Sequence, residues 1–471
     1  MQYISTRGRA PALAFDEVLL CGLARDGGLY VPAVWPLFSR DDIRSLKGLS
    51  YAEVALRVMQ PFVGDTVPAD ALRRIVDETY AGFGHRCVAP LKQLAPNLWL
   101  MELFHGPTLA FKDYAMQVLA RLFDHVLSAR GERVTIVGAT SGDTGAAAIE
   151  ACRDRANIDC FILFPKGRVS PVQQRQMTTV DAPNVHAIAV EGTFDDCQDM
   201  VKAAFNDSGF RDAYGLSAVN SINWARIMPQ IAYYFWAAAN LGAPERPVSF
   251  AVPTGNFGNV YAAYAARQMG LPIERLVTGS NANDILTRFF ETGDMEIRGV
   301  VPTLSPSMDI QVSSNFERLL FDLMDRDGAE VDATLTAFRR DGRFTVGANR
   351  MGPASALFIA ARSDDAATLD TIRRVRDETG ELLDPHTAVG VGAVEQTRKQ
   401  RDPAVPVVAL ACAHPAKFAE AIERAVGAPA PLPERMADLL TRPERNPVIP
   451  NELAALQGYI RDRVATRGVE A

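Results

Sequence analysis

The sequence has few cysteines for its length, and no two of them are spaced as a metal-binding or redox pair. Six cysteines occur among 471 residues, and no two form a Cys-x-x-Cys motif. The pattern argues against a disulfide framework and against a zinc site. We therefore expect no metal centre, and thiols that stay reduced in the cytoplasm. The six are Cys21, Cys87, Cys152, Cys160, Cys197 and Cys412.

Long apolar runs and a strong excess of charge are also missing. The apolar run IAYYFWAAA at 231–239 is far too short to span a bilayer. The first residues show no basic region followed by an apolar stretch, which a secretory signal would have. The formal net charge is −7, and this mild acidity argues against nucleic acid or an anionic membrane as a partner. We expect a cytoplasmic protein that binds neither.

What is present is enough chain for about two or three domains. Residues 1–95 carry apolar residues at helical spacing, at 50–62 and again at 68–83. Pro68 suits the first turn of the second of these helices. We interpret 1–95 as a mainly helical N-terminal domain.

From residue 96 onward, β-branched runs alternate with helical patterns. Such alternation predicts β-α-β units, parallel sheets and an α/β fold. We interpret 96–471 as one region of two α/β subdomains with a Pro-rich C-terminal tail from about 429. The expected strands are 133–139, 159–164, 185–190 and 247–252, and a helix is expected at 195–207.

One Gly-rich loop, PTGNFGN at 253–259, follows a predicted strand and precedes a predicted helix. Such a loop presents free backbone N–H groups and the positive end of a helix dipole, which suits a phosphate. Gly255 and Gly258 would let the backbone curl around it. A tight turn explains the loop about equally well. Because neither a dinucleotide-binding nor a Walker A pattern is present, a nucleotide ligand is poorly supported.

A second loop, ATSGDTGAAA at 139–148, also joins a strand to a helix. Ser141, Thr144 and nearby N–H groups could bind a carboxylate or a phosphate. Asp143 could equally be a helix N-cap. The two loops together suggest a ligand with two anionic ends.

Lys112 adds a third element, in the segment HGPTLAFKD at 105–113. A lysine here could simply snorkel from the first turn of a helix, or pair with Asp113. Alternatively, it is a buried amine that forms a Schiff base with pyridoxal phosphate, whose phosphate needs a loop such as 253–259. Only this second interpretation also accounts for the two anion loops.

The segment ELFHGPTLAFKD at 102–113 resembles the cofactor-lysine segment of the threonine synthase family, and the resemblance continues along nearly the whole chain. It implies the α/β architecture of fold-type II pyridoxal-phosphate enzymes, shared with the tryptophan synthase β chain. It also implies the bacterial and fungal-like branch of the family. The other matching strings are YISTRG, LARDGGLYVP, GATSGDTGAAA, NSINWARIMPQ, PTGNFGN, LSPSMDIQVSSNFERLLF, DPHTAVG and AHPAKF.

The implied reaction converts O-phospho-L-homoserine and water to L-threonine and phosphate, the last step of threonine biosynthesis, by a lyase acting on a carbon–oxygen bond. In this reading Lys112 holds the cofactor and moves protons. Asp143 stands where related enzymes carry an Asn beside the 3-oxygen of the cofactor. Ser141 and Thr144 would hold the substrate carboxylate. The cofactor phosphate would lie on Gly255, Asn256, Phe257, Gly258 and Asn259.

The resemblance also implies a clamp for the substrate phosphate in NSINWAR, from Asn220, Ser221, Asn223 and Arg226. Arginine offers phosphate a planar fork. A salt bridge on a helix surface is the ordinary alternative for Arg226. His105 and Thr108 precede Lys112 closely and are candidates to line the pocket. For His386 and His414, ligand contact and a structural hydrogen bond stay open.

One position departs from the family pattern. The family commonly has TAHPAKF, with the threonine hydroxyl facing the pyridine nitrogen, and this chain has CAHPAKF. Cys412 therefore takes that place with a thiol, which is a weaker hydrogen-bonding partner.

Two other readings stay open besides a threonine synthase that acts as a monomer or a homodimer. A threonine synthase-like phospho-lyase would eliminate phosphate without making threonine. A non-catalytic pyridoxal-phosphate binder would use the same scaffold, although it should then lack the lysine or an anion loop.

Overall fold

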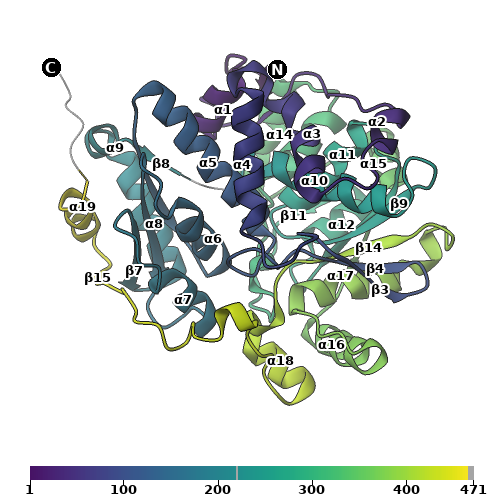
Figure 1. The fold of residues 1–471 in the computed structure, drawn as a ribbon. Helices are drawn as coiled ribbons and strands as arrows, with labels where there is room; N and C mark the ends of the chain where they lie inside the picture. The colour runs from purple at the N-terminus through teal and green to yellow at the C-terminus, as the bar shows by residue number, and fades with distance from the viewer. Residues whose placement is uncertain (219–220, 465–471) are drawn as a thin grey trace. The chain divides into compact units, whose positions relative to one another are not determined.

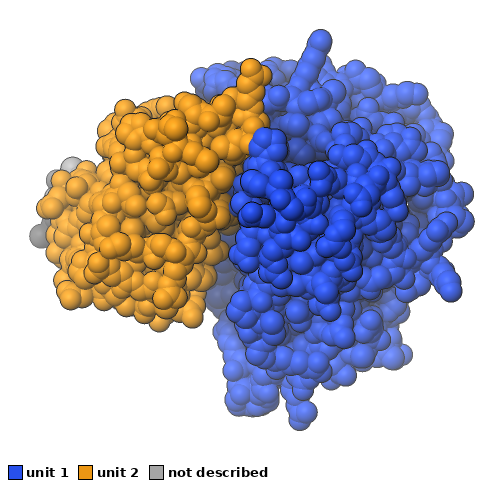
Figure 2. Space-filling model, turned by 90° about the horizontal axis from the view of Figure 1, so that it is seen from below, with its two compact units in different colours: residues 1–105, 221–431 blue, residues 106–220, 432–471 orange. Residues whose placement is uncertain are grey.

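The computed structural model describes residues 1–218 and 221–464. The chain forms two compact units, coloured separately in Figure 2: unit 1 comprises Met1–His105 and Ser221–Pro431, and unit 2 comprises Gly106–Asn220 and Leu432–Ala471. Within the described ranges, no helix has both the length and the apolar character needed to cross a membrane. The same ranges hold no group of three His, Cys, Asp or Glu side chains placed to bind a metal.

The N-terminal part of unit 1 is mainly helical, and its elements follow the predicted pattern. Ser50 caps α3 together with Glu53, and Pro68 stands just before α4, one residue earlier than its expected place in the first turn. The elements are β1 (Tyr3–Ser5), α1 (Phe15–Cys21), β2 (Tyr30–Pro32), α2 (Arg40–Arg44), α3 (Tyr51–Val63) and α4 (Ala69–Ala81).

The main sheet of unit 1 has the strand order β13-β10-β9-β14-β4-β3. Every pairing is parallel except β3 with β4. Helix α17 (Pro385–Gln396) packs on one face of it, and α16 (Asp365–Thr379) and α18 (Ala419–Val426) add buried side chains to the same hydrophobic cluster. The strands are β3 (Leu91–Ala95), β4 (Leu98–Glu102), β9 (Val248–Pro253), β10 (Ile273–Ser280), β13 (Phe358–Arg362) and β14 (Val407–Ala411).

The remaining elements of unit 1 surround this sheet, and β11 pairs with β12 in a separate two-stranded sheet. They are α10 (Trp224–Asn240), α11 (Gly258–Gln268), α12 (Ile285–Thr292), β11 (Asp294–Glu296), α13 (Phe316–Leu323), α14 (Gly328–Asp341), β12 (Arg343–Thr345), α15 (Ala348–Leu357), α16 (Asp365–Thr379), α17 (Pro385–Gln396) and α18 (Ala419–Val426).

Unit 2 is built on a five-stranded sheet of order β15-β7-β6-β5-β8, in which all pairs are parallel. Phe161 and Leu163 of β6 point into a core with α8 and α19. Ile162 points the other way, toward Gly145 of α6. This alternation is what a parallel strand covered on both faces requires.

The elements of unit 2 confirm the predicted alternation of strands and helices. The Pro-rich tail contributes one strand that the sequence pattern did not reveal, β15, which pairs with β7. The elements are α5 (Lys112–Arg130), β5 (Val134–Ala139), α6 (Asp143–Cys152), β6 (Ile158–Pro165), α7 (Pro171–Thr178), β7 (Val185–Glu191), α8 (Phe194–Asn206), α9 (Ser208–Tyr214), β8 (Leu216–Ser217), β15 (Val448–Pro450) and α19 (Leu453–Arg461).

A half-buried histidine of unit 2 is expected to reduce the stability of the fold in acid. His186 of β7 stacks on Phe161, with ring centroids 4.6 Å apart, and its Nδ1 lies 3.4 Å from the Tyr459 hydroxyl. Burial, with help from the charges of Arg463 and Arg445, lowers the pKa of His186 to about 4. The neutral ring is therefore the form that the fold favours. Its stabilisation is complete above the unfolded pKa of about 6.5 and is lost as the pH falls toward 4.

We therefore expect His186→Phe, which keeps the stack on Phe161, to lose less stability in acid than the wild type. After discounting for the partial exposure of the ring, the wild type should lose roughly 1 kcal/mol more than the variant between pH 7 and pH 4. Thermal melts of both proteins at the two pH values measure this. Equal losses would show that His186 does not contribute to acid sensitivity.

Candidate active site

In unit 2, the turn before Lys112 is held by a buried carboxylate. The Thr108 hydroxyl and backbone N–H donate to Asp113 at 2.6 and 2.8 Å, and Asp113 is fully buried. A Cβ at Gly106 would lie 2.4 Å from the Asp113 side chain, so this close approach requires glycine. The turn thus delivers Lys112 as the first residue of α5.

The Lys112 side chain is only 11% exposed, and its Nζ lies 3.4 Å from Asp143 Oδ2. Asp143 is the first residue of α6, where Gly142 holds the N-cap position. The other oxygen of Asp143 accepts a hydrogen bond from Gln173 Nε2 at 2.7 Å. Asp143 is therefore not the helix cap, and a polar network orients it toward the lysine.

The loop before α6 is shaped by Thr140. Its hydroxyl oxygen accepts hydrogen bonds from the N–H groups of Gly142 and Gly145, at 3.0 and 2.9 Å. Ser141 is exposed beside this turn, and Thr144 is half-buried in the first turn of α6. The N–H groups of a first helical turn lack partners within the helix, so an anion can bind there.

In unit 1, the buried side chain of Phe257 anchors the loop from β9 to α11. Phe257 has a φ of 63°, and its buried ring packs against Phe290, Phe316 and Phe358. The left-handed turn brings the backbone of Gly258 to the helix start. The ring of Phe257 therefore belongs to the core, and its backbone is what the loop can offer a ligand.

Asn259 follows in the first turn of α11. Its Oδ1 accepts from the hydroxyls of Tyr233 and Tyr234, at 2.5 and 2.7 Å. Its Nδ2 is buried and has no hydrogen-bond partner among the described residues. A buried amide N–H at a helix N-terminus fits an anionic ligand.

The backbone of Cys412 is linked by hydrogen bonds to Asp384, a buried carboxylate at the start of α17. The Cys412 N–H donates to Thr387 Oγ1 at 3.0 Å, and that hydroxyl donates to Asp384. Asp384 also contacts His386 Nδ1 at 2.9 Å, while His386 Nε2 accepts from the N–H of Ser307 at 3.3 Å. Because Nε2 accepts, Nδ1 is the nitrogen that carries the proton. His386 therefore makes structural hydrogen bonds.

The two other candidate histidines, His105 and His414, also have protein partners. His105 Nε2 lies 2.7 Å from Glu102 Oε2. His414 caps a 3₁₀ turn, where its Nδ1 accepts from the N–H of Ala416 at 3.2 Å.

Of the predicted phosphate clamp, Asn220 lies outside the described residues. Ser221 is half-buried. Asn223 is the N-cap of α10: its Oδ1 accepts from the N–H of Ala225 at 2.9 Å, and its Nδ2 donates to Leu19 O at 2.8 Å. Both polar atoms of the Asn223 side chain thus make structural hydrogen bonds to the backbone.

Arg226 lies in the first turn of α10 and is 5% exposed. No described residue accepts a hydrogen bond from its Nε or Nη1. Burial lowers the pKa of its guanidinium to about 10. The structure therefore rules out a surface salt bridge for Arg226, and an uncompensated buried cation of this kind suits an anion.

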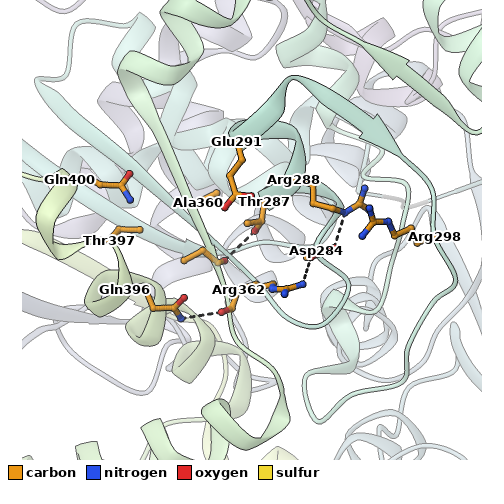
Figure 3. A pocket seen from close by; sticks show the side chains of 11 residues that line it. Asp284, Thr287, Arg288, Glu291, Arg298, Ala360, Arg362, Gln396, Thr397 and Gln400 are labelled. Atoms are coloured by element: carbon orange, nitrogen blue, oxygen red, sulfur yellow. Dashed lines mark hydrogen bonds and ion pairs between the residues drawn. The ribbon is translucent and has the colours of Figure 1, made fainter.

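A cavity of about 550 Å³ elsewhere in unit 1 contains none of these residues (Figure 3). Asp284 accepts from Arg288 Nε at 2.9 Å and from Arg362 Nη1 at 2.6 Å. Two arginines that line this cavity, Arg288 and Arg362, are thus paired with the carboxylate of Asp284.

Sequence reasoning missed four contributors. Asp384 lies in the quoted string DPHTAVG, and Asn315 and Arg318 lie in the quoted string LSPSMDIQVSSNFERLLF, but none of the three residues received a chemical role. Gln173 had no sequence signal, because its contact with Asp143 depends on how α7 packs.

Known protein families match almost the whole chain. The family described as pyridoxal-phosphate dependent enzymes matches residues 85–338. The threonine synthase N terminus matches residues 2–80, and the C-terminal threonine synthase family matches 387–460. The fold and these matches define a fold-type II pyridoxal-phosphate-dependent enzyme, as predicted. More narrowly, the chain belongs to the threonine synthase family.

Individual relatives are similar to this chain in sequence over most of their length. The threonine synthase of Pseudomonas aeruginosa is 56% identical, with 98% of each chain covered. A protein named threonine synthase-like 2 from Homo sapiens is 37% identical over 429 residues, covering 90% of this chain and 88% of that one.

Solved structures of threonine synthases have nearly the same fold as this chain. The pyridoxal-phosphate-bound threonine synthase of Brucella melitensis has a TM-score of 0.97 at 55% identity, covering 98% of this chain and 99% of that one. The yeast threonine synthase has a TM-score of 0.94 at 38% identity, with 98% of each chain covered.

Proposed function

We propose that this protein is a threonine synthase, which converts O-phospho-L-homoserine and water to L-threonine and phosphate. The observation that carries this is the 56% identity to a threonine synthase over 98% of both chains. Pyridoxal phosphate is the cofactor, and a small molecule is the substrate.

The residues present fit this cofactor. Lys112 supplies a largely buried amine, and Asn259 Nδ2 and the first-turn N–H groups of α11 supply unpaired donors for a phosphate. When bound, the cofactor supplies an aldehyde for a lysine and a conjugated ring that stores the electrons released at the substrate Cα.

We assign the cofactor to Lys112, Asp143, Cys412 and the loop Gly255, Asn256, Phe257, Gly258 and Asn259. Lys112 would hold the cofactor covalently through its amine and would move the proton at the substrate Cα. The carboxylate of Asp143 orients the amine, because it lies 3.4 Å from Nζ and is itself held by Gln173. The thiol of Cys412 would serve as the hydrogen-bonding partner of the ring nitrogen.

We assign the substrate carboxylate to Ser141 and Thr144 at the start of α6. The substrate phosphate is assigned to Arg226, with Asn220, Ser221 and Asn223. Arg226 supports this assignment most directly, since its guanidinium is buried with unpaired N–H donors. Asn223 contributes by capping α10 and so placing Arg226, because its own side chain is already hydrogen-bonded.

The test is a product assay on purified, cofactor-loaded protein supplied with O-phospho-L-homoserine. A synthase releases threonine and phosphate in equal amounts. A phospho-lyase releases 2-oxobutyrate in place of threonine, and a non-catalytic binder releases neither. Either of the last two results would overturn the proposed function.

We expect Cys412→Thr to keep threonine synthesis within about threefold of the wild type. The Cys412 side chain is 6% exposed, and its backbone N–H is already fixed by Thr387. A hydroxyl donates and accepts hydrogen bonds better than a thiol, so the ring-nitrogen contact should be kept or strengthened. Steady-state kinetics measure this. Loss of activity with the cofactor still bound would contradict the assignment of Cys412.

Three further assignments belong to this proposal. The enzyme is cytoplasmic and acts without nucleic acid or a membrane. It is a monomer or a homodimer, which light scattering distinguishes. Residues 1–95 form its N-terminal domain, and 96–471 form the catalytic region with the tail from about 429.

A further inference from the structure

Arg318 is a fully buried cation whose role in the proposed reaction is unassigned. It lies in α13, and three neutral oxygens of unit 1 accept from it. Nε donates to Tyr30 O at 3.1 Å, Nη2 donates to Ile222 O at 2.5 Å, and Nη1 donates to Asn315 Oδ1. Burial lowers the pKa of its guanidinium to about 10.

Asn315 extends these contacts to both predicted ligand segments. Its Nδ2 donates to Ser221 O at 3.1 Å. Its backbone N–H donates to Asn256 O, also at 3.1 Å. A Cβ at Gly258 would lie 3.2 Å from Asn315 Nδ2, so the amide packs directly against the start of α11.

Together the two residues tie the segment 221–226 to the loop 255–259. The carbonyls of Ser221 and Ile222 lie just before Asn223 and α10, which carries Arg226 in its first turn. The carbonyl of Asn256 lies in the loop before α11. Holding these carbonyls fixes where the guanidinium of Arg226 stands relative to the N–H groups of the loop.

We propose that Asn315 and Arg318 are positioning residues, which hold the Arg226 clamp and the 255–259 loop in one fixed arrangement for a phosphate-bearing substrate. This rests on the proposed function, and it adds a specificity role for a string, SSNFERLL, that had none. A planar fork suits this task, because one rigid group reaches three acceptors at once.

Unit 1 offers a matched control in Arg326. It donates to the carbonyls of Ala33 and Pro32 at 2.7 and 3.0 Å, as Arg318 does to that of Tyr30. Its guanidinium lies 5.5 Å from the Phe321 ring, as that of Arg318 lies 5.8 Å from the Trp224 ring. Its contacts with Ala33, Pro32 and Asp322 do not involve residues 221–226. Arg326→Met thus removes a similar structural anchor without touching the clamp.

The experiment compares Arg318→Met, Asn315→Ala and Arg326→Met as cofactor-loaded proteins. Calorimetry measures the dissociation constant for inorganic phosphate, and steady-state kinetics separate KM from kcat. We expect the first two variants to raise both the phosphate dissociation constant and KM about tenfold, with kcat changed less than about threefold. Arg326→Met should leave all three constants near wild type.

Asn315→Ala separates positioning from charge, because it keeps the cation of Arg318. If only Arg318→Met weakens phosphate binding, its charge and not its placement matters, and the proposal is overturned. Equal effects in Arg326→Met would overturn it as well. If Arg318→Met does not fold, the phosphate dissociation constant of Asn315→Ala tests the proposal alone, and an unchanged value overturns it.

Failure of the proposed function is a separate outcome of the same measurements. It would appear as a wild type that makes no threonine. The phosphate dissociation constants would still test the positioning role in that case.

Discussion

Replacing Lys112 with alanine should abolish threonine formation, with a fall in kcat of about 1,000-fold or more. The residue combines two tasks in the proposed reaction, covalent attachment of the cofactor and proton transfer at Cα. Its surroundings suit both, since the side chain is 11% exposed and Asp143 lies 3.4 Å from Nζ.

Lys112→Arg sharpens the test, because a guanidinium keeps the positive charge beside Asp143 but cannot take over the amine chemistry. We expect it to be as inactive as Lys112→Ala while remaining folded. Lys166→Ala is the control, since Lys166 is a half-exposed lysine of the same unit that pairs with Glu191 at 3.4 Å. Substantial activity in Lys112→Arg would show that the residue acts only through its charge.

Chemical trapping identifies the lysine independently of turnover. Borohydride reduction of the loaded protein fixes the covalent link, and peptide mapping then locates the added mass. We expect it at Lys112 and not at Lys417, a lysine of unit 1 that is 0% exposed. A label on Lys417, or none at all, would contradict the assignment.

Replacing Arg226 with methionine should raise KM for O-phospho-L-homoserine by about 10- to 100-fold, with a smaller change in kcat. A hydrogen bond to a charged group contributes about 1.5–3 kcal/mol, and the guanidinium fork offers phosphate more than one. Phosphate binds in the ground state as well as during reaction, so its loss should appear mainly in KM.

The same substitution should not lower the melting temperature, and we expect it to raise it by a few degrees. Burial holds the pKa of Arg226 at about 10, below its usual range, so the fold disfavours its charge. No described residue accepts from Nε or Nη1. Methionine fills a similar space without an uncompensated cation. Thermal melts without phosphate measure this.

Both readouts for Arg226→Met must rise, KM because substrate binding is lost and the melting temperature because a buried cation is removed. Glutamine at the same position is the useful comparison, because it keeps polarity without charge. A melting temperature that falls together with an unchanged KM would show that Arg226 stabilises the fold and does not bind the substrate.

Local features of the site followed from the sequence. A β-branched run, a short Gly-rich segment and a helical pattern predict a strand, a loop and a helix, and the structure has β9 and α11 on either side of 254–257. The same reasoning placed Lys112 near a helix start and Asp143 after β5. These features depend on backbone preferences and periodicity within about 15 residues, which neighbouring residues determine.

Side-chain pairing was decided by tertiary structure. Asn259 and Phe257 are predicted ligand residues, and only the structure shows that Asn259 Oδ1 accepts from Tyr233 and Tyr234 and that the Phe257 ring lies in a phenylalanine cluster. The sequence was equally consistent with Asp143 as a helix cap, but in the structure its carboxylate accepts a hydrogen bond from Gln173. Such contacts depend on which helices lie against which strand, and no local pattern encodes that.

The sequence by itself determined the α/β class and the alternation of strands and helices, and it supplied the candidate residues for a pyridoxal-phosphate site. Only the folded chain decided that Arg226 is buried with unpaired donors, and that Asn315 and Arg318 reach carbonyls 94 and 96 residues away along the chain. The physical reason is that hydrogen bonding and desolvation depend on what surrounds a group in space, whereas backbone preference depends on its neighbours in sequence.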